Sequence, residues 1–247
     1  MDVEKEIQFF DRFEADHGEY DVLAEGAYTR LLDFIAKRIN PQPGTHCVDL
    51  GCGTGAFTRR MARFKLELTG IDISPRSIER ANLQGGGRFL QGDITNCTLP
   101  SESCDLVVMS GVLHHLPESE LRIKCLREAL RILRPNGQFF SYDPNAHSPS
   151  MFFFRDPRSP VYSPKGKTEN EVLLSSAEIK SELEEAGFAK VDIRGLSGIP
   201  YRFVEGKLPM LLLPLYNAIY EPLIRFSPLE KFLGTFLVAV ASKAPHS

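Results

Sequence analysis

The residues with the clearest chemical meaning lie between Val48 and Asp72. An apolar segment ending at Leu50 runs into the turn GCGTG, residues 51–55, and a segment with helical spacing follows directly. Glycines at such a turn allow a tight bend and let the backbone approach a ligand without an intervening Cβ. The start of the following helix supplies unpaired N–H groups and partial positive charge, which suit a carboxylate or a phosphate.

An acidic residue follows at the distance that nucleotide-binding folds use. Asp72 ends the next apolar segment, in TGIDIS, where a carboxylate can accept both hydroxyls of a ribose. Gly51, Gly53 and Ala56 also fit the dinucleotide pattern GxGxxA, so spacing alone does not choose the nucleotide. The two features together predict a nucleotide-type cofactor on a strand–turn–helix unit.

The elements that must position these residues alternate along the chain. Expected strands are His46–Leu50, Leu66–Ile71, Arg88–Gln91, Asp105–Ser110, Gln138–Tyr142, Lys190–Arg194 and Phe236–Ser242. Expected helices are residues 3–15 and 21–39, Ala56–Phe64, Pro75–Leu83, Pro117–Leu133 and Ser176–Ala186. Strands alternating with helices of this length predict a parallel sheet with right-handed crossovers.

Composition favours one globular domain and disfavours a nucleic-acid partner. The chain has 247 residues, 43% hydrophobic and 25% charged, which suits a single α/β domain with insertions. Its net charge of −3 gives no general attraction to nucleic acid, so a nucleic-acid partner is not expected. Four arginines of the helix after Pro117 are interpreted as a solvated face: Arg122, Arg127, Arg131 and Arg134.

Several features favour a cytoplasmic location. The five cysteines form no CxxC pair and no metal-ligand spacing, so we expect small buried residues in a reducing compartment and no metal site. The segment MDVEKEIQFF lacks the layout of a signal peptide. The most apolar tract, Leu208–Ile219, is interrupted by proline and is shorter than the roughly 20 residues of a transmembrane helix.

Five successive motifs make the interpretation more specific. DLGCGTG, GIDIS, QGDIT, CDLVVMSGVLHHL and LRPNGQFF cover residues 48–142 and, in this order, resemble class I S-adenosylmethionine-dependent methyltransferases. They resemble especially the small-molecule branch that includes quinone-biosynthesis enzymes. The resemblance implies S-adenosylmethionine as cofactor. It also implies a Rossmann-like α/β fold: a seven-stranded, mostly parallel sheet with helices on both faces and an antiparallel last strand, Phe236–Ser242.

The resemblance also assigns cofactor-binding roles to matching positions. These are Asp49, Gly51, Cys52, Gly53 and Gly55 for the methionine part, Asp72 for the ribose, Ile73, Asp93 and Ile94 around the adenine, and Ser110 for the methyl-transfer pocket. For Asp93, a simpler role as the cap of a turn in residues 92–95 stays open.

Two residues are candidates for a general base, His115 and Tyr20. A base is needed only if the acceptor must lose a proton. Holding the acceptor in line with the methyl group can contribute about 7–11 kcal/mol without one. His114 and His115 follow the fourth expected strand. Their side chains either line the ligand pocket or only form hydrogen bonds with backbone groups.

The chain is interpreted as a single domain, 1–247, with additions that set substrate choice. A helical cap (1–40) precedes a cofactor-binding core (45–142), and two substrate-side insertions follow, 143–173 and 196–231. Three phenylalanines at 152–154 and the apolar tract 208–224 favour a hydrophobic or lipid-like acceptor, although both could simply pack on the domain. A peripheral membrane contact by residues 208–226 stays open, as does a monomer or a homodimer.

Two other classes of function are kept as alternatives. An NAD(P)-dependent oxidoreductase would need a Tyr-x-x-x-Lys or comparable pair after the fourth strand, and none is present. A non-catalytic S-adenosylmethionine-binding regulatory protein would bind the cofactor without turnover.

Overall fold

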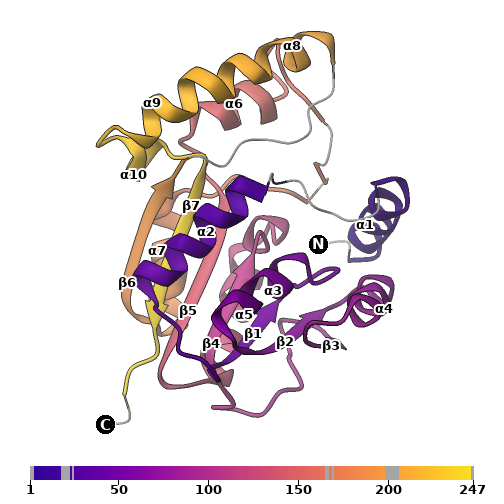
Figure 1. Ribbon diagram of the computed structural model, residues 1–247, viewed down its shortest axis with the longest axis vertical. Coiled ribbons are helices and arrows are strands. Elements are labelled where there is room, and N and C mark those ends of the chain that lie inside the picture. The colour runs from indigo at the N-terminus through magenta and orange to yellow at the C-terminus, as the bar shows by residue number, and fades with distance from the viewer. Residues whose placement is uncertain are drawn as a thin grey trace.

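A seven-stranded sheet forms the centre of the computed structural model, which describes residues 3–17, 23, 25–164, 167–168, 170–197 and 206–245. The strand order is β3-β2-β1-β4-β5-β7-β6 (Figure 1). The strands are β1 (His46–Leu50), β2 (Glu67–Asp72), β3 (Arg88–Gln91), β4 (Cys104–Ser110), β5 (Leu133–Pro144), β6 (Ala189–Leu196) and β7 (Phe236–Ser242). β7 runs antiparallel to β5 and β6, whereas β1 to β5 pair in parallel. The predicted Rossmann-like sheet with an antiparallel last strand is therefore confirmed.

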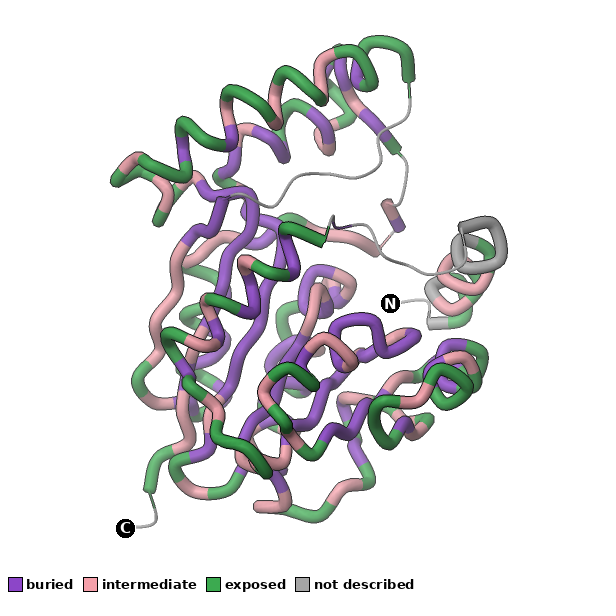
Figure 2. The backbone as a smooth tube through the Cα atoms, viewed as in Figure 1, coloured by how far each residue is buried: buried purple, intermediate pink, exposed green. Residues whose placement is uncertain are grey.

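Helices cover both faces of this sheet, because its central strands are apolar on both sides. On β4, Leu106 and Val108 belong to a core cluster with α2 (Glu25–Arg38) and α3 (Ala56–Arg60). Val107 and Met109 point the other way, into a cluster with α5 (Ser119–Ile132) and α7 (Ser176–Ala186). Figure 2 shows the strands between the two layers as mostly buried.

The remaining elements lie around the carboxyl ends of the parallel strands or connect them. They are α1 (Val3–His17), the 3₁₀ helices η1 (Met61–Phe64) and η2 (Leu113–His115), α4 (Pro75–Gln84), α6 (Pro149–Arg155), α8 (Lys207–Leu215), the π-helical turn η3 (Tyr216–Tyr220), α9 (Glu221–Arg225) and α10 (Glu230–Leu233). α8, η3 and α9 follow one another as one continuous helix beside α6 (Figure 1).

Two expectations about local structure are wrong. β5 begins at Leu133 rather than Gln138, because Leu133 is fully buried and pairs with Cys104 ahead of a register shift in β4. Arg122 does not face solvent: it is 4% exposed, and its guanidinium lies 2.6 Å from Oε1 of Glu182 on α7. Helical spacing places Arg122 on the flank of the apolar face, and only the docking of α7 decides that this flank is buried.

None of the helices in the described part of the chain is both long and apolar enough to cross a bilayer. The five cysteines are all buried and free of disulfides.

Candidate active site

The turn between β1 and α3 leaves open space above its middle glycine. Gly51, Gly53 and Gly55 all have left-handed backbones, with φ of 78°, 51° and 79°. An added Cβ at Gly51 would lie 2.6 Å from Val112, and one at Gly55 would lie 2.7 Å from Phe89. At Gly53 it would meet nothing within 4 Å. The outer two glycines therefore serve packing, whereas Gly53 borders the space that a ligand can enter.

Asp72, at the end of β2, is hydrogen-bonded to this turn. Its Oδ2 accepts a hydrogen bond from the Gly53 N–H over 2.8 Å, and its Oδ1 accepts one from the Ser74 N–H over 2.9 Å. Burial raises the pKa of Asp72 while these backbone N–H groups oppose the rise. Each carboxylate oxygen has a second lone pair, so the geometry remains compatible with ribose hydroxyls as further donors.

Asp49 is a buried carboxyl group beneath the same turn. Its Oδ2 accepts a hydrogen bond from Thr58 Oγ1 over 2.6 Å, whereas Oδ1 is buried without a partner among the described residues. Burial raises the pKa of Asp49 to about 7. A buried oxygen without a donor costs free energy. A ligand with an ammonium group, such as the methionine part of S-adenosylmethionine, supplies the missing donor and charge, so these residues fit that cofactor.

The other predicted cofactor residues line the same edge in different ways. Ile73 is 38% exposed directly after Asp72, and Ile94 packs partly buried against the core. The side chain of Cys52 is buried with Ile78, Ala81 and Phe89, so its contribution to a ligand site would come from its backbone.

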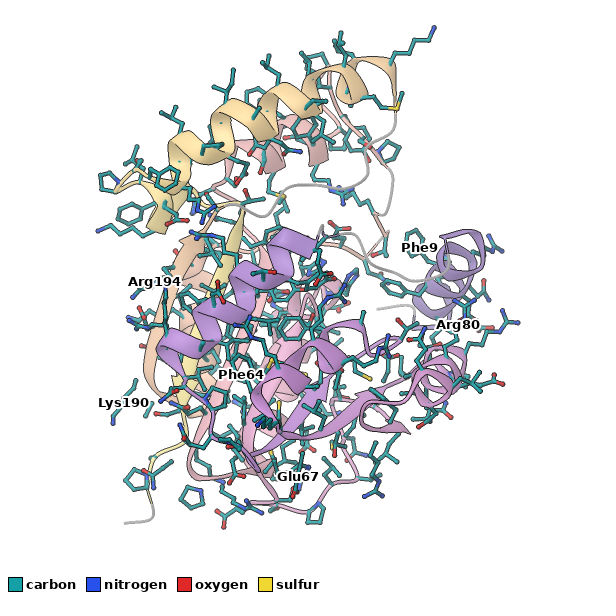
Figure 3. All side chains as sticks on the ribbon, viewed as in Figure 1. Phe9, Phe64, Glu67, Arg80, Lys190 and Arg194 are labelled. Atoms are coloured by element: carbon teal, nitrogen blue, oxygen red, sulfur yellow. The ribbon has the colours of Figure 1, made fainter. Side chains whose placement is uncertain are left out.

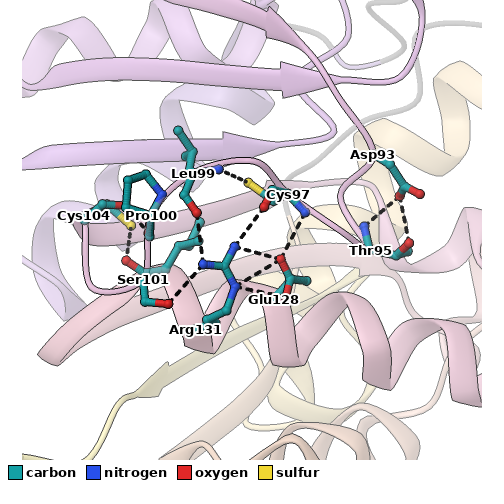
Figure 4. Close-up of polar contacts among 11 residues, drawn as sticks. Asp93, Thr95, Cys97, Leu99, Pro100, Ser101, Cys104, Glu128 and Arg131 are labelled. Carbon is teal, nitrogen blue, oxygen red and sulfur yellow. Dashed lines mark hydrogen bonds and ion pairs between the residues drawn. The ribbon is translucent and has the colours of Figure 1, made fainter.

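Asp93 has the turn-capping role that the sequence left open. Its Oδ1 accepts hydrogen bonds from N–H and Oγ1 of Thr95, over 2.7 and 2.8 Å (Figure 4). The following segment is held on α5 by Arg131, which donates to the carbonyl oxygens of Cys97 and Leu99. Both bonds to Asp93 use one oxygen, so a cofactor contact through Oδ2 remains a proposal.

The carboxyl ends of β4 and β5 bring together a second set of polar side chains. Ser110 Oγ donates a hydrogen bond to the hydroxyl of Tyr142 over 2.9 Å. Nδ1 of His114 lies 2.9 Å from Oδ1 of Asp143. An added Cβ at Gly111 would lie 3.5 Å from Cε1 of His114 and 3.8 Å from Cε2 of Tyr142, so these groups converge around Gly111.

Asp143 and Tyr142 were missed by sequence reasoning. Asp143 is fully buried, its Oδ2 has no partner within the described ranges, and burial raises its pKa to about 7. The signal that could have found Asp143 is an acidic residue at the carboxyl end of the fifth strand, the edge where ligands bind in such sheets.

His115 has different surroundings from its neighbour. Its Nδ1 lies 3.3 Å from Oγ1 of Thr168, and its ring lies edge-on to Phe10 of α1, with centroids 5.3 Å apart. Tyr20, the other predicted base, lies outside the described residues. No group of three His, Cys, Asp or Glu side chains suited to a metal ion occurs in the part of the chain that the structure describes.

α1 reaches across this edge of the sheet. Asp11 accepts a hydrogen bond from Ser74 Oγ over 3.3 Å and pairs with Arg76 at the start of α4. Figure 3 shows Phe9 on α1 and Arg80 on α4 at this end of the molecule. α1 thus connects the cofactor side, at α4, with the histidines that follow β4.

Comparisons with known proteins agree with this geometry. Residues 48–141 match the family model of a methyltransferase domain. The chain is 35% identical over 133 residues to 27-O-demethylrifamycin SV methyltransferase of Amycolatopsis mediterranei, covering 49% of this chain and 48% of that relative's length. It is 26% identical over 180 residues to ubiquinone biosynthesis O-methyltransferase of Xanthomonas axonopodis pv. citri, covering 69% of this chain and 73% of that relative.

A solved structure shows the same fold over the whole length. An S-adenosylmethionine-dependent methyltransferase from Thermotoga maritima superposes with a TM-score of 0.63 at 21% identity and covers 96% of each chain. The matched domain spans β1 to β5 and contains both the glycine turn and the residues after β4. The segment from β1 to β5 is therefore similar to a methyltransferase domain, and the chain has the fold of an S-adenosylmethionine-dependent methyltransferase of known structure. This similarity supports S-adenosylmethionine, rather than a nicotinamide nucleotide, as the cofactor.

Proposed function

We propose that the protein transfers the methyl group of S-adenosylmethionine to a hydroxyl oxygen of a small hydrophobic acceptor. The observation that carries this proposal is the contact between His114 and Asp143 at the cofactor edge of the sheet. A hydroxyl group is a poor nucleophile near neutral pH unless a base removes its proton. A histidine oriented by a buried carboxylate is suited to that task.

In the proposed reaction, Asp143 orients His114, and His114 removes the proton of the acceptor hydroxyl. An ionised Asp143 can only accept hydrogen bonds, so Nδ1 of His114 carries the proton and Nε2 is the basic nitrogen of the neutral ring. The acceptor's proton would pass to Nε2, and the positive charge on the ring would be stabilised by Asp143. The bound cofactor supplies an activated methyl group on a sulfonium and leaves as S-adenosylhomocysteine. His115 and Tyr20 remain the predicted alternatives as base.

The hydrophobic character of the acceptor is inferred from the insertion after β5 and from its partner helices. On α6, Met151 and Phe154 are buried, and the Phe154 ring meets the Tyr216 ring edge-on with centroids 5.3 Å apart. α6, α8 and α9 lie together beyond the end of β5 (Figure 1). We propose that the insertions 143–173 and 196–231 shape the acceptor site. The names of the two relatives, one an O-methyltransferase of ubiquinone biosynthesis, support an oxygen acceptor.

The cytoplasm is the proposed compartment, since the five free buried cysteines would persist in a reducing environment.

A screen for labelled methyl transfer tests the proposed reaction. The protein is incubated with methyl-labelled S-adenosylmethionine and with matched lipid-soluble and water-soluble metabolite fractions. The proposal predicts label in a lipid-soluble product, as a base-stable ether, with one S-adenosylhomocysteine formed per methyl group. Label only in water-soluble products would contradict the acceptor class. Cofactor binding without turnover in either fraction would favour the non-catalytic alternative.

A further inference from the structure

The helix formed by α8, η3 and α9 has its polar and apolar sides reversed relative to an ordinary surface helix. Positions at helical spacing form an outward apolar face, which comprises Leu208, Leu211, Leu215, Ile219, Leu223 and Phe226 and is 44% to 80% exposed. The inward side carries the polar groups instead. Glu221 is buried and accepts hydrogen bonds from the hydroxyls of Tyr216 and Thr235. A helix surrounded by water presents the opposite arrangement.

The exposed charges around the apolar face all have one sign. Among the described residues from 206 to 233, the exposed charged side chains are Lys207, Arg225 and Lys231, and every other exposed residue is glycine, proline, alanine or a large apolar residue. The two acids of this segment, Glu221 and Glu230, are bonded inward, to Thr235 and to Arg30. The chain as a whole has a net charge of −3, so this concentration of positive charge is local.

Two of the cations lie over aromatic rings at the end of this segment. The guanidinium of Arg225 lies 5.4 Å from the centroid of Phe226, and Nζ of Lys231 lies 4.8 Å from that of Phe232. Phe226 and Phe232 are 80% and 58% exposed. Aromatic rings and long basic side chains side by side are suited to the boundary between lipid headgroups and acyl chains.

We propose that the apolar face docks on the surface of an anionic lipid bilayer, with the helix lying in the plane of the membrane. Contiguous exposed apolar surface of this kind marks an interaction site. The apolar residues would enter the boundary region, and Lys207, Arg225 and Lys231 would face the anionic headgroups. Figure 3 shows mostly carbon atoms on the outer side of this helix, away from the sheet.

A bilayer fits this face better than a protein does. A two-fold interface with a second copy would bring the same three cations together from both sides. An interface with a protein has about one hydrogen bond per 100–200 Å². The exposed uncharged residues from 206 to 233 have no side-chain donor, and their one side-chain acceptor is the weakly accepting sulfur of Met210. The docking goes beyond the proposed methyl transfer and does not depend on it.

Vesicle flotation of the full chain, without cofactor or acceptor, tests the docking. Vesicles of equal parts phosphatidylglycerol and phosphatidylcholine should carry the protein upward, and vesicles of phosphatidylcholine alone should carry much less. Combining Leu215→Gln, Ile219→Gln and Leu223→Gln should abolish flotation. The matched control is Leu83→Gln, since Leu83 is 82% exposed on α4 and should leave flotation unchanged.

A double charge reversal distinguishes the contribution of the cations from that of the apolar face. Arg225→Glu with Lys231→Glu should reduce flotation on the anionic vesicles, whereas Lys124→Glu on α5 should not. Unchanged S-adenosylmethionine affinity shows that each variant is folded. Failure of the unmodified protein to float, or equal flotation of the triple variant, would overturn the proposal. A third outcome would also overturn the proposal: the unmodified protein is a dimer in light scattering, the triple variant is a monomer, and neither binds vesicles.

Discussion

Oδ1 of Asp143 contacts both the ring Nδ1 and the backbone N–H of His114, over 2.9 and 3.1 Å. One carboxylate oxygen thereby fixes the position of the histidine and the orientation of its ring. The two residues come from the ends of neighbouring strands, since β4 and β5 pair up to Ser110 and Tyr142. The arrangement distinguishes His114 from His115, whose Nδ1 faces the hydroxyl of Thr168.

Replacement of the two histidines tests which of them is the base. His114→Gln should lower kcat by about 10²- to 10⁴-fold, the usual contribution of a general base. Cofactor affinity should stay near that of the unmodified protein in calorimetry. His115→Gln is the matched control and should have a much smaller effect. A larger loss of kcat in His115→Gln would identify His115 as the general base instead.

Asp49 should make cofactor affinity depend on pH. Its pKa of about 7 means that a protonated, uncharged carboxyl becomes the major form below that pH, and it then attracts an ammonium group poorly. S-Adenosylmethionine should therefore bind about tenfold more weakly at about pH 6 than at about pH 8. Asp49→Asn should bind weakly and lose that tenfold difference. Equal pH dependence in both proteins would remove Asp49 from the cofactor site.

The same ionisation should destabilise the ligand-free fold. Because the folded-state pKa of Asp49 lies above its ordinary value, this carboxyl holds its proton more tightly in the folded protein than in the unfolded chain over the range from about 4 to about 7. The contribution of Asp49 to the free energy of unfolding therefore falls as pH rises through this range. Asp49→Asn should accordingly melt at a higher temperature than the unmodified protein at about pH 8.

The ion pair between Arg122 and Glu182 offers a test of stability. Arg122→Ala leaves the buried carboxylate of Glu182 without its charged partner, which costs about 3–5 kcal/mol of unfolding free energy. Arg127→Ala is the matched control, because the Arg127–Glu185 pair is 58% exposed on both sides and should contribute about 0–1 kcal/mol. Denaturant unfolding measures both values. Similar losses in the two variants would contradict the buried pairing.

Replacement of residues 205–226 by a short polar linker tests the insertion between β6 and β7. If this segment shapes the acceptor site, S-adenosylmethionine binding should remain while transfer to the acceptor is lost. Thermal unfolding shows whether the fold survives the loss of Glu221 and Ile224, which are both buried. Cooperative unfolding at a much lower temperature would identify the segment as part of the core instead.

The arrangement proposed to hold the cofactor could be predicted, because the residues that form it lie close together in sequence. Gly51 to Asp72 form one strand–turn–helix–strand unit, so spacing alone brings the glycine turn to the aspartate. The polar residues proposed to meet the acceptor could not be predicted in this way. His114 and Asp143 meet only because β4 and β5 are neighbours, and Arg122 meets Glu182 only because α5 packs on α7.

The orientation of the α8–α9 helix also depends on tertiary structure. Its sequence is apolar at almost every turn, so periodicity does not say which side is inward. The structure turns Glu221 toward Thr235 and leaves Leu215 and Leu223 outside. Packing on α6, through Phe154 and Tyr216, decides the orientation.

Titration calorimetry of cofactor binding with Asp72→Ala tests the assignment of the cofactor most directly. Asp72 is predicted to accept the ribose hydroxyls, and each charged hydrogen bond lost costs about 1.5–3 kcal/mol. The unmodified protein should bind S-adenosylmethionine and not NAD, and folded Asp72→Ala should bind S-adenosylmethionine at least about tenfold more weakly. Unchanged affinity in the folded variant, or tighter binding of NAD than of S-adenosylmethionine, would contradict the account.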